Sequence, residues 1–358
     1  MIYEWLYPLR ESVKLFNLLR YITFRAGLSL TFSLILTLLL IPLYLKLTKY
    51  RERISEYVPL AHKRKEGTPS AGGIVFISVT IISTILFTKF NTPFPMVALI
   101  ATFFMFVIGL FDDLKKLKGT KKGGLTKWEK LFLQFLLAAF IVIAINMFYP
   151  PEIAKRTQFL FFKNINLYLG NLYIIFIILV FLGFTNAVNL TDGLDGLAAG
   201  SAIPPLTVIL LLAYFQGNKI LSTYLHLFYI PGIEELTILA ASTIGSLIGF
   251  LWYNSYPAQI FMGDTGSQTI GGIIAVSSVL LKQEILIIIA GGLFVIEALS
   301  VLIQVIYFRS TRGKRIFKKA PYHHHFEELG MHEAKITVRF WIVSLIFSLI
   351  ALGMVKIK

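Results

Sequence analysis

Ten long runs of apolar residues, separated by polar stretches, dominate the pattern along this chain of 358 residues. A helix needs about 20 apolar residues to cross the hydrocarbon layer of a membrane, and every run reaches or approaches that length. The pattern predicts an all-α, polytopic membrane protein with ten transmembrane helices. They are expected at residues 26–45, 71–88, 93–111, 131–149, 172–191, 196–215, 236–253, 265–281, 285–308 and 340–355.

The remaining segments predict little else that is folded. Residues 1–22 mix charged and aromatic side chains, lack the apolar core and cleavage site of a removable signal, and are typical of an interfacial segment. Between the fourth and fifth runs, residues 158–162 and 165–169 flank Lys163-Asn164, a pattern that indicates a small hairpin. Without internal repeats or low-complexity linkers, residues 1–358 are predicted to form a single integral-membrane domain.

Composition agrees with a membrane protein and narrows its chemistry. The chain is 56% apolar and 15% charged, with a mean hydropathy of +0.74. Soluble proteins of this length rarely show such values. There are no cysteines, which excludes disulfides, thiolate nucleophiles and cysteine-based metal sites.

Lysine and arginine are distributed unevenly between the two faces. Loops 46–70, 112–130 and 309–335 hold seven each, whereas the opposite loops together hold six and the two tails hold six more. The positive-inside rule makes the three basic loops cytoplasmic and places both termini outside. This topology accounts for most of the net charge of +15, so no nucleic-acid partner is needed to explain it. The same charge would attract membrane lipids with anionic headgroups and phosphorylated substrates.

Asp112 and Asp113 end the third apolar run abruptly, at the C-terminus of the predicted helix. Adjacent carboxylates repel each other, and the helix dipole disfavours them there. The compensating cation is either a nearby lysine, Lys115 or Lys116, or a bound divalent ion. Lys116 is also a candidate phosphate ligand, because it lies one helical turn from Asp113.

Two further polar clusters follow the fifth and seventh runs. Asn186, Asn189, Asp192 and Asp195 lie within ten residues around Gly193 and Leu194. Asp195 alone is explained by helix capping, but four such side chains favour a polar site. Asp264 precedes the eighth run, where it either caps a helix or presents a carboxylate to a metal-bound phosphate. The preceding Phe261 is available to stack on a base.

The first and last inside loops add basic and histidine-rich stretches. Lys65-Glu-Gly67-Thr-Pro-Ser70 leads into Gly72-Gly73 and is either a turn with a helix start or an anion-binding loop. His323, His324 and His325 are consecutive, so regular structure cannot aim all three at one metal. Donation to phosphate, or proton transfer by one of them, fits better. Glu297 lies within the ninth run and is interpreted as structural or groove-lining.

All five predicted inside loops carry such clusters and the outside loops carry none, so the sequence predicts an active site at the cytoplasmic face. In order and combination, the clusters resemble the polyprenyl-phosphate N-acetylhexosamine-1-phosphate transferase superfamily, and the unbroken histidine run followed by Phe-Glu resembles its muramyl-peptide branch. The family pattern leads us to expect Thr-Met where this chain has Ser70-Ala71, and residues 118–124 also depart from it.

The resemblance implies a reaction: UDP-MurNAc-pentapeptide and undecaprenyl phosphate give undecaprenyl-pyrophosphoryl-MurNAc-pentapeptide and UMP, with Mg²⁺, at a bacterial inner membrane crossed by a multi-pass protein. The resemblance does not decide the oligomeric state, which is either a monomer or a homodimer. Phosphoryl transfer between anions requires a divalent ion, cationic donors and orientation, as these clusters provide.

Residue roles follow as hypotheses. Asp264 would bind Mg²⁺ with Asp113 as a second ligand, and Asp112 would deprotonate or orient the lipid phosphate for direct attack. A covalent aspartyl intermediate is the rival mechanism. The uridine pocket would use Lys65, Gly193, Leu194, Asp195 and Phe261. Pyrophosphate and sugar would meet Lys116, Asn189, Asp192, Asn254, Gln304, His323, His324 and His325, of which His323 and His324 are candidate catalytic residues beside the three aspartates. Ser70 and Asn186 are further candidate substrate-binding residues.

Two other functions stay open on these residues. A GlcNAc-1-phosphate transferase of the same superfamily would differ in the loop that meets the sugar. A transporter would place its binding residues in broken helices near the middle of the membrane, where this chain has only Glu297.

Overall fold

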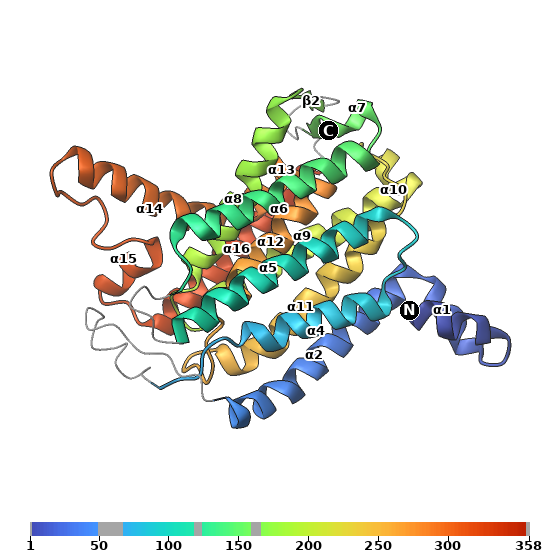
Figure 1. Ribbon diagram of the computed structural model, residues 1–358, viewed down its shortest axis with the longest axis horizontal. Coiled ribbons are helices and arrows are strands. Elements are labelled where there is room, and N and C mark those ends of the chain that lie inside the picture. Colours follow the sequence, from blue (N-terminus) through green and yellow to red (C-terminus); the bar gives the residue numbers. More distant parts are fainter. Residues whose placement is uncertain (1, 49–66, 118–123, 159–165, 356–358) are drawn as a thin grey trace.

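The computed structural model describes residues 2–48, 67–117, 124–158 and 166–355. Long helices form a bundle in which most run roughly parallel (Figure 1). They are α2 (Ile22–Leu47), α4 (Gly73–Phe87), α5 (Pro93–Leu117), α6 (Lys127–Phe148), α8 (Leu172–Thr191), α9 (Leu197–Gly217), α11 (Leu236–Asn254), α12 (Gly263–Leu280), α14 (Gly292–Ser310) and α16 (Glu333–Met354).

Eight helices of the described chain are long and apolar enough to cross a membrane, namely α2, α5, α6, α8, α9, α11, α14 and α16. The all-α, polytopic membrane fold is thus confirmed. Of the other two predicted spans, α4 has only 15 residues and α12 mixes apolar residues with Gly, Ser, Thr and Gln. Every residue of α12 from Thr265 to Leu280 is buried, which places this polar helix in the centre of the bundle.

Shorter elements connect the long helices. They are α1 (Ile2–Leu6), η1 (Tyr7–Glu11), η2 (Lys14–Arg20), α7 (Pro151–Ala154), β1 (Arg156–Gln158), β2 (Asn166–Tyr168), α10 (Lys219–Tyr224), η3 (Ile233–Glu235), α13 (Glu284–Ala290) and α15 (Tyr322–Glu328). Antiparallel pairing in this region is confirmed, with Arg156 opposite Tyr168, but β1 ends at Gln158 where the first predicted strand, 158–162, begins, and residues 159–162 lie outside the described residues. The predicted turn at Lys163-Asn164 lies outside the described residues.

The predicted ninth span is wrong as a single helix, because the chain breaks at Gly291 into α13 and α14. Close packing explains why glycines stand at this break. A Cβ on Gly291 would lie 2.7 Å from the ring of Phe184, and one on Gly292 would lie 2.7 Å from the ring of Phe347. Beyond the break, α14 leaves the bundle and leads to α15 (Figure 1), which positions the histidine-rich segment beside the helix ends.

A closed polar cluster lies at the far end of the bundle from α15, formed by Tyr149, Thr157, Tyr173, Lys282 and Glu284. Lys282 Nζ donates to a carbonyl of α7 at 2.8 Å and to the Tyr173 hydroxyl at 3.1 Å. The Glu284 carboxylate accepts from the hydroxyls of Thr157 and Tyr173. Lys282 and Glu284 are fully buried, so the cluster joins the hairpin to α8 and α13 without contacting solvent.

Candidate active site

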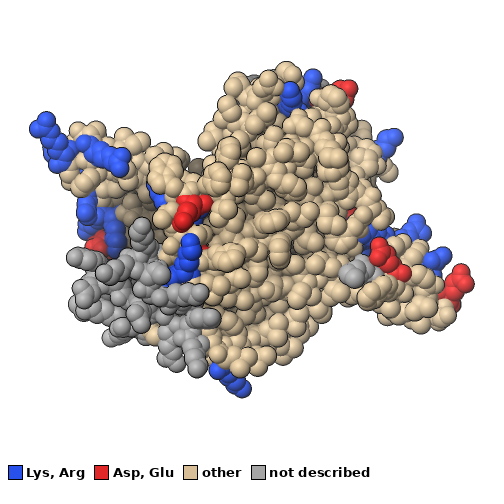
Figure 2. Space-filling model, viewed as in Figure 1, with Lys and Arg blue, Asp and Glu red and all other residues tan. Residues whose placement is uncertain are grey.

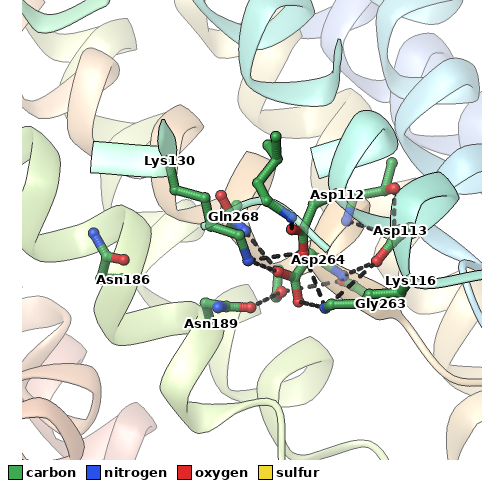
Figure 3. A network of polar contacts seen from close by, with 12 residues as sticks. Asp112, Asp113, Lys116, Lys130, Asn186, Asn189, Gly263, Asp264 and Gln268 are labelled. Atoms are coloured by element: carbon green, nitrogen blue, oxygen red, sulfur yellow. Dashed lines mark hydrogen bonds and ion pairs between the residues drawn. The ribbon is translucent and has the colours of Figure 1, made fainter. Parts of the chain in front are cut away.

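Three carboxylates converge where the third apolar run ends. Asp112 and Asp113 lie in the last turns of α5, and Asp264 lies in the first turn of α12 (Figure 3). One oxygen of each lies within 4.8 Å of the others. Gly109 allows this approach, because a Cβ there would lie 2.6 Å from the Asp264 carbonyl oxygen. Residues 152 positions apart in the chain thus share one site.

Two lysines neutralise much of this negative charge. Lys116 lies one turn beyond Asp112, and its Nζ is 3.0 Å from both Asp112 Oδ2 and Asp264 Oδ1. Lys130 Nζ is 2.7 Å from Asp112 Oδ2 and 2.5 Å from Asp264 Oδ2. Both ammonium groups bridge Asp112 and Asp264 (Figure 3). The Lys116 side chain is 43% exposed, so the cluster is open on that side.

A capping box positions Lys130. Thr126 and Glu129 exchange side-chain to backbone hydrogen bonds and start α6 at Lys127. Lys130 therefore lies in the first turn of α6, with its side chain directed to the carboxylates. The Thr-x-x-Glu pattern was present in the sequence, but only the fold shows that α6 begins beside Asp112 and Asp264.

Asp113 acts as a cap for a different helix. Its Oδ1 accepts the Asp264 N–H at 3.0 Å, and its Oδ2 accepts the N–H and hydroxyl of Thr265 at 2.9 and 2.5 Å. These N–H groups begin α12 and have no partner within that helix. Gly263 adopts a φ of +73° here, and a Cβ on it would lie 2.7 Å from Asp113 Oδ2. Asp113 thereby fixes the position of Asp264.

A chain of amides extends from Asp264 towards α8. Asn186 donates to Gln134 at 3.0 Å, Gln134 donates to Gln268 at 3.2 Å, and Gln268 donates to Asp264 Oδ2 at 2.9 Å. All three donors point towards the carboxylate, and hydrogen bonds in such chains polarise one another. Nearby, Asn189 accepts from the Ser267 hydroxyl at 2.7 Å. The predicted residues Asn186 and Asn189 are thus linked to α12, through residues of α6 and α12 that the sequence did not single out.

The turn between α8 and α9 lies against the chain that follows α11. Asp195 is buried and accepts the Ala258 N–H at 3.0 Å instead of capping its own helix. Asn254 accepts the Gly196 N–H at 3.1 Å. The Leu194 side chain is buried in a small apolar cluster, which leaves only its backbone for ligand binding. Asp192 ends α8 as its C-cap.

The segment around Ser70 pairs with the segment around Phe261. Phe261 donates its N–H to the Pro69 carbonyl and accepts from Gly72, both at 2.8 Å, while the Ser70 carbonyl accepts from the Tyr44 hydroxyl. These contacts hold the segment that leads into α4 beside the start of α12. Lys65 lies outside the described residues.

The three histidines have three different surroundings. His323 is fully buried, and its Nδ1 lies 3.0 Å from Glu297 Oε2. His324 contacts Glu327 at 2.5 Å; burial lowers the pKa of His324 below its ordinary value, although Glu327 opposes this. His325 Nδ1 accepts the Lys318 N–H.

Gln304 belongs to the same region. Its side-chain oxygen accepts the Phe317 N–H at 2.9 Å. Like His325, Gln304 supports the loop that precedes α15.

The carboxylate cluster fits a divalent cation. Mg²⁺ prefers oxygen ligands, which the carboxylates supply. Asp264 and Asp112 already attract two ammonium groups, so the negative charge of these carboxylates also suits a metal cation. Asp113 Oδ1 accepts one hydrogen bond and retains a second lone pair for a metal. Asp264 and Asp113 could therefore both contribute ligands.

Comparisons with known proteins agree with this geometry. A family model described as "Glycosyl transferase family 4" matches residues 95–282, which include Asp112, Asp113 and Asp264. Proteins named phospho-N-acetylmuramoyl-pentapeptide-transferase are similar over 100% of both chains. Those of Desulfotalea psychrophila and Rickettsia prowazekii are 42% identical to this chain, and that of Citrifermentans bemidjiense is 43% identical. The chain belongs to the phospho-N-acetylmuramoyl-pentapeptide-transferase family.

Proposed function

We propose that this protein transfers phospho-MurNAc-pentapeptide from UDP-MurNAc-pentapeptide to undecaprenyl phosphate and releases UMP, in a reaction that depends on Mg²⁺. One observation carries the proposal: Asp112, Asp113 and Asp264 converge with two lysines at helix ends. Full-length relatives named for this transfer support it.

The site would lie at the cytoplasmic face of a bacterial inner membrane. Ten crossings, with α4 and α12 added to the eight long apolar helices, would return both termini to the outer side. In Figure 1 the marked chain ends lie at the end of the bundle away from α15, as this topology requires. Figure 2 shows Lys and Arg side chains on α14 and along the loop that follows it, in keeping with a cytoplasmic face there.

Asp112 would act on the acceptor. Its Oδ2 lies within 3.0 Å of two ammonium groups, and its Oδ1 accepts the Leu125 N–H at 2.7 Å, so the carboxylate is held in one orientation. It would take a proton from the lipid phosphate or orient it. A phosphate oxygen would then attack the phosphorus next to the sugar, and the bond from that phosphorus to the oxygen of UMP would break.

The lysines would bind the transferring phosphates. In the described structure Lys116 and Lys130 are paired with carboxylates, and their charges match those of a pyrophosphate. A bound Mg²⁺ would neutralise the charge that develops on the phosphate oxygens. Asp264 would hold the metal, and Asp113 would fix Asp264 through the start of α12 and offer a second ligand.

The remaining predicted residues would surround the nucleotide sugar. The uridine would lie near Ser70, Gly193, Asp195 and Phe261, with the backbone of Leu194 and with Lys65. Pyrophosphate and sugar would meet Asn189, Asp192 and His324, with Asn186, Asn254, Gln304 and His325 holding the surrounding loops in place.

Release of UMP tests the proposal directly. Purified protein in detergent is given undecaprenyl phosphate and either UDP-MurNAc-pentapeptide or UDP-GlcNAc, each with and without Mg²⁺. We expect release only with the muramyl substrate and the metal. Release with UDP-GlcNAc alone would assign the protein to the GlcNAc-1-phosphate branch. No release from folded protein would contradict a transferase and favour a transporter.

A further inference from the structure

Glu297 of α14 and His323 of α15 form a buried pair that the proposed chemistry has not used. Both side chains are fully buried. Glu297 Oε1 accepts the backbone N–H of His323 at 3.2 Å, and Glu297 Oε2 lies 3.0 Å from its Nδ1. A carboxylate only accepts hydrogen bonds, so Nδ1 carries the proton in this contact. Two bonds to one residue fix both the backbone and the ring of His323.

The other ring nitrogen of His323 is left without a partner. His323 Nε2 is buried and makes no hydrogen bond within the described part of the chain. Leaving such an atom unpaired is unfavourable, so it calls for an explanation such as a partner that binds there. The nitrogen faces the turn between α8 and α9, where a Cβ on Gly193 would lie 2.3 Å from it. Because residue 193 is glycine, no side chain fills the space beside Nε2 at that turn.

We propose that Glu297 is a positioning residue, which holds Nδ1 of His323 so that Nε2 donates a hydrogen bond to a phosphate oxygen of the nucleotide sugar beside Gly193. The inference rests on the proposed function. A carboxylate bonded to one ring nitrogen sets the ring orientation, and in the doubly protonated ring the second nitrogen is also a donor. A buried glutamate within a predicted membrane span thereby acquires a role in substrate binding.

The experiment compares Glu297→Gln with wild type in the UMP-release assay. Glutamine keeps the size of the side chain but removes its charge and one of its two acceptors. We expect kcat/KM for the nucleotide sugar to fall about 10- to 100-fold, roughly the effect of losing one or two charged hydrogen bonds. KM for undecaprenyl phosphate should stay within about twofold of wild type, because the pair faces the other substrate.

A double-mutant cycle separates positioning from a structural role. His323→Asn keeps a donor close to Glu297 but has no atom in place of Nε2. If Glu297 acts through Nε2, adding Glu297→Gln to His323→Asn should change kcat/KM by less than about twofold. Equal losses in the wild-type and His323→Asn backgrounds would overturn the proposal, as would an unchanged kcat/KM in either single variant.

Two further variants keep the test decisive. Gly193→Ala places a methyl against Nε2 without touching Glu297, so it should lower kcat/KM in the wild-type background but change it by less than about twofold in the His323→Asn background, which separates this effect from loss of the proposed uridine contact. Glu284→Gln is the matched control: Glu284 is also a fully buried glutamate that accepts two side-chain hydrogen bonds, but from Thr157 and Tyr173. It should keep wild-type kcat/KM. Failure of the wild type to release UMP would instead reject the proposed function.

Discussion

Among the charged clusters of the described bundle, the carboxylate site and the closed polar cluster lie at opposite ends and are built differently. The carboxylate site has three acids and two lysines, and the Lys116 side chain is 43% exposed. The closed polar cluster has one lysine and one glutamate, both fully buried, with tyrosine and threonine hydroxyls as partners. The first keeps surplus negative charge at an accessible place, whereas the second is balanced and sealed.

This difference separates function from stability. Excess carboxylate next to solvent is unfavourable for the isolated protein, because like charges repel, and it becomes favourable when a cation or a charged substrate arrives. The closed polar cluster has no excess charge for a ligand to neutralise. Substitutions in the carboxylate site should therefore reduce turnover, and substitutions in the closed polar cluster should reduce the free energy of unfolding.

Asp264→Asn should give the largest effect. Asp264 contacts both Lys116 and Lys130 and is the main candidate metal ligand. Because the substitution removes its negative charge, we expect kcat to fall about 10³-fold or more. The measurement is UMP release at saturating Mg²⁺. The unfolding midpoint should stay close to that of wild type. Turnover within about tenfold of wild type would reject Asp264 as the metal ligand.

Glu284→Gln should give an effect of intermediate size on the opposite property. Replacing a buried carboxylate that accepts two side-chain hydrogen bonds should lower the free energy of unfolding by about 2 kcal/mol. Thermal unfolding in detergent measures the loss, and kcat measured below the midpoint should be unchanged. A loss of turnover without a loss of stability would erase the distinction between the two clusters.

The last effect concerns pH and is spread over several pH units. Burial lowers the pKa of Lys282 to about 7, although Glu284 opposes the shift, whereas the unfolded chain keeps a value near 10.5. Between these values the unfolded state binds the additional proton, so stability should rise with pH by up to about 1.4 kcal/mol per unit. Unfolding midpoints from pH 7 to 9 measure this slope. Lys282→Met should flatten it, and an equal slope in that variant would assign the dependence to other groups.

The sequence predicted the long helices well because apolar periodicity and length are local properties. It was wrong for the ninth span, where the apolar run continues across Gly291 although the helix breaks there and Phe184 and Phe347 pack closely on Gly291 and Gly292. Hydropathy does not register such steric contacts. Hydropathy also fails to show how deeply α12 is buried. Its polar residues make it less hydrophobic than the other long helices, yet the fold places it in the centre of the bundle.

The candidate site was predictable as a set of residue types but not as a set of contacts. Asp112, Asp113 and Asp264, which the sequence analysis placed in one active site, do converge in the fold. Lys130, Gln134 and Gln268 were missed as members of the site, because only the fold brings Lys130 and Gln134 of α6 within hydrogen-bonding distance of Asp264 and Gln268 of α12. Glu297 was likewise interpreted as structural or groove-lining, because the sequence does not show its contact with His323. The roles in substrate binding stay predictions.

The cap that Asp113 provides for α12 has a consequence for how such a chain can change over generations. Asp113 and Thr265 are 152 positions apart, yet two hydrogen bonds join them and a third joins Asp113 to the Asp264 N–H, so the end of α5 and the start of α12 depend on each other. An asparagine at 113 would retain one acceptor oxygen and turn a donor towards the N–H groups of α12. Selection should therefore treat the end of α5 and the start of α12 as a single heritable unit, and recombination between relatives should succeed only when both come from one parent.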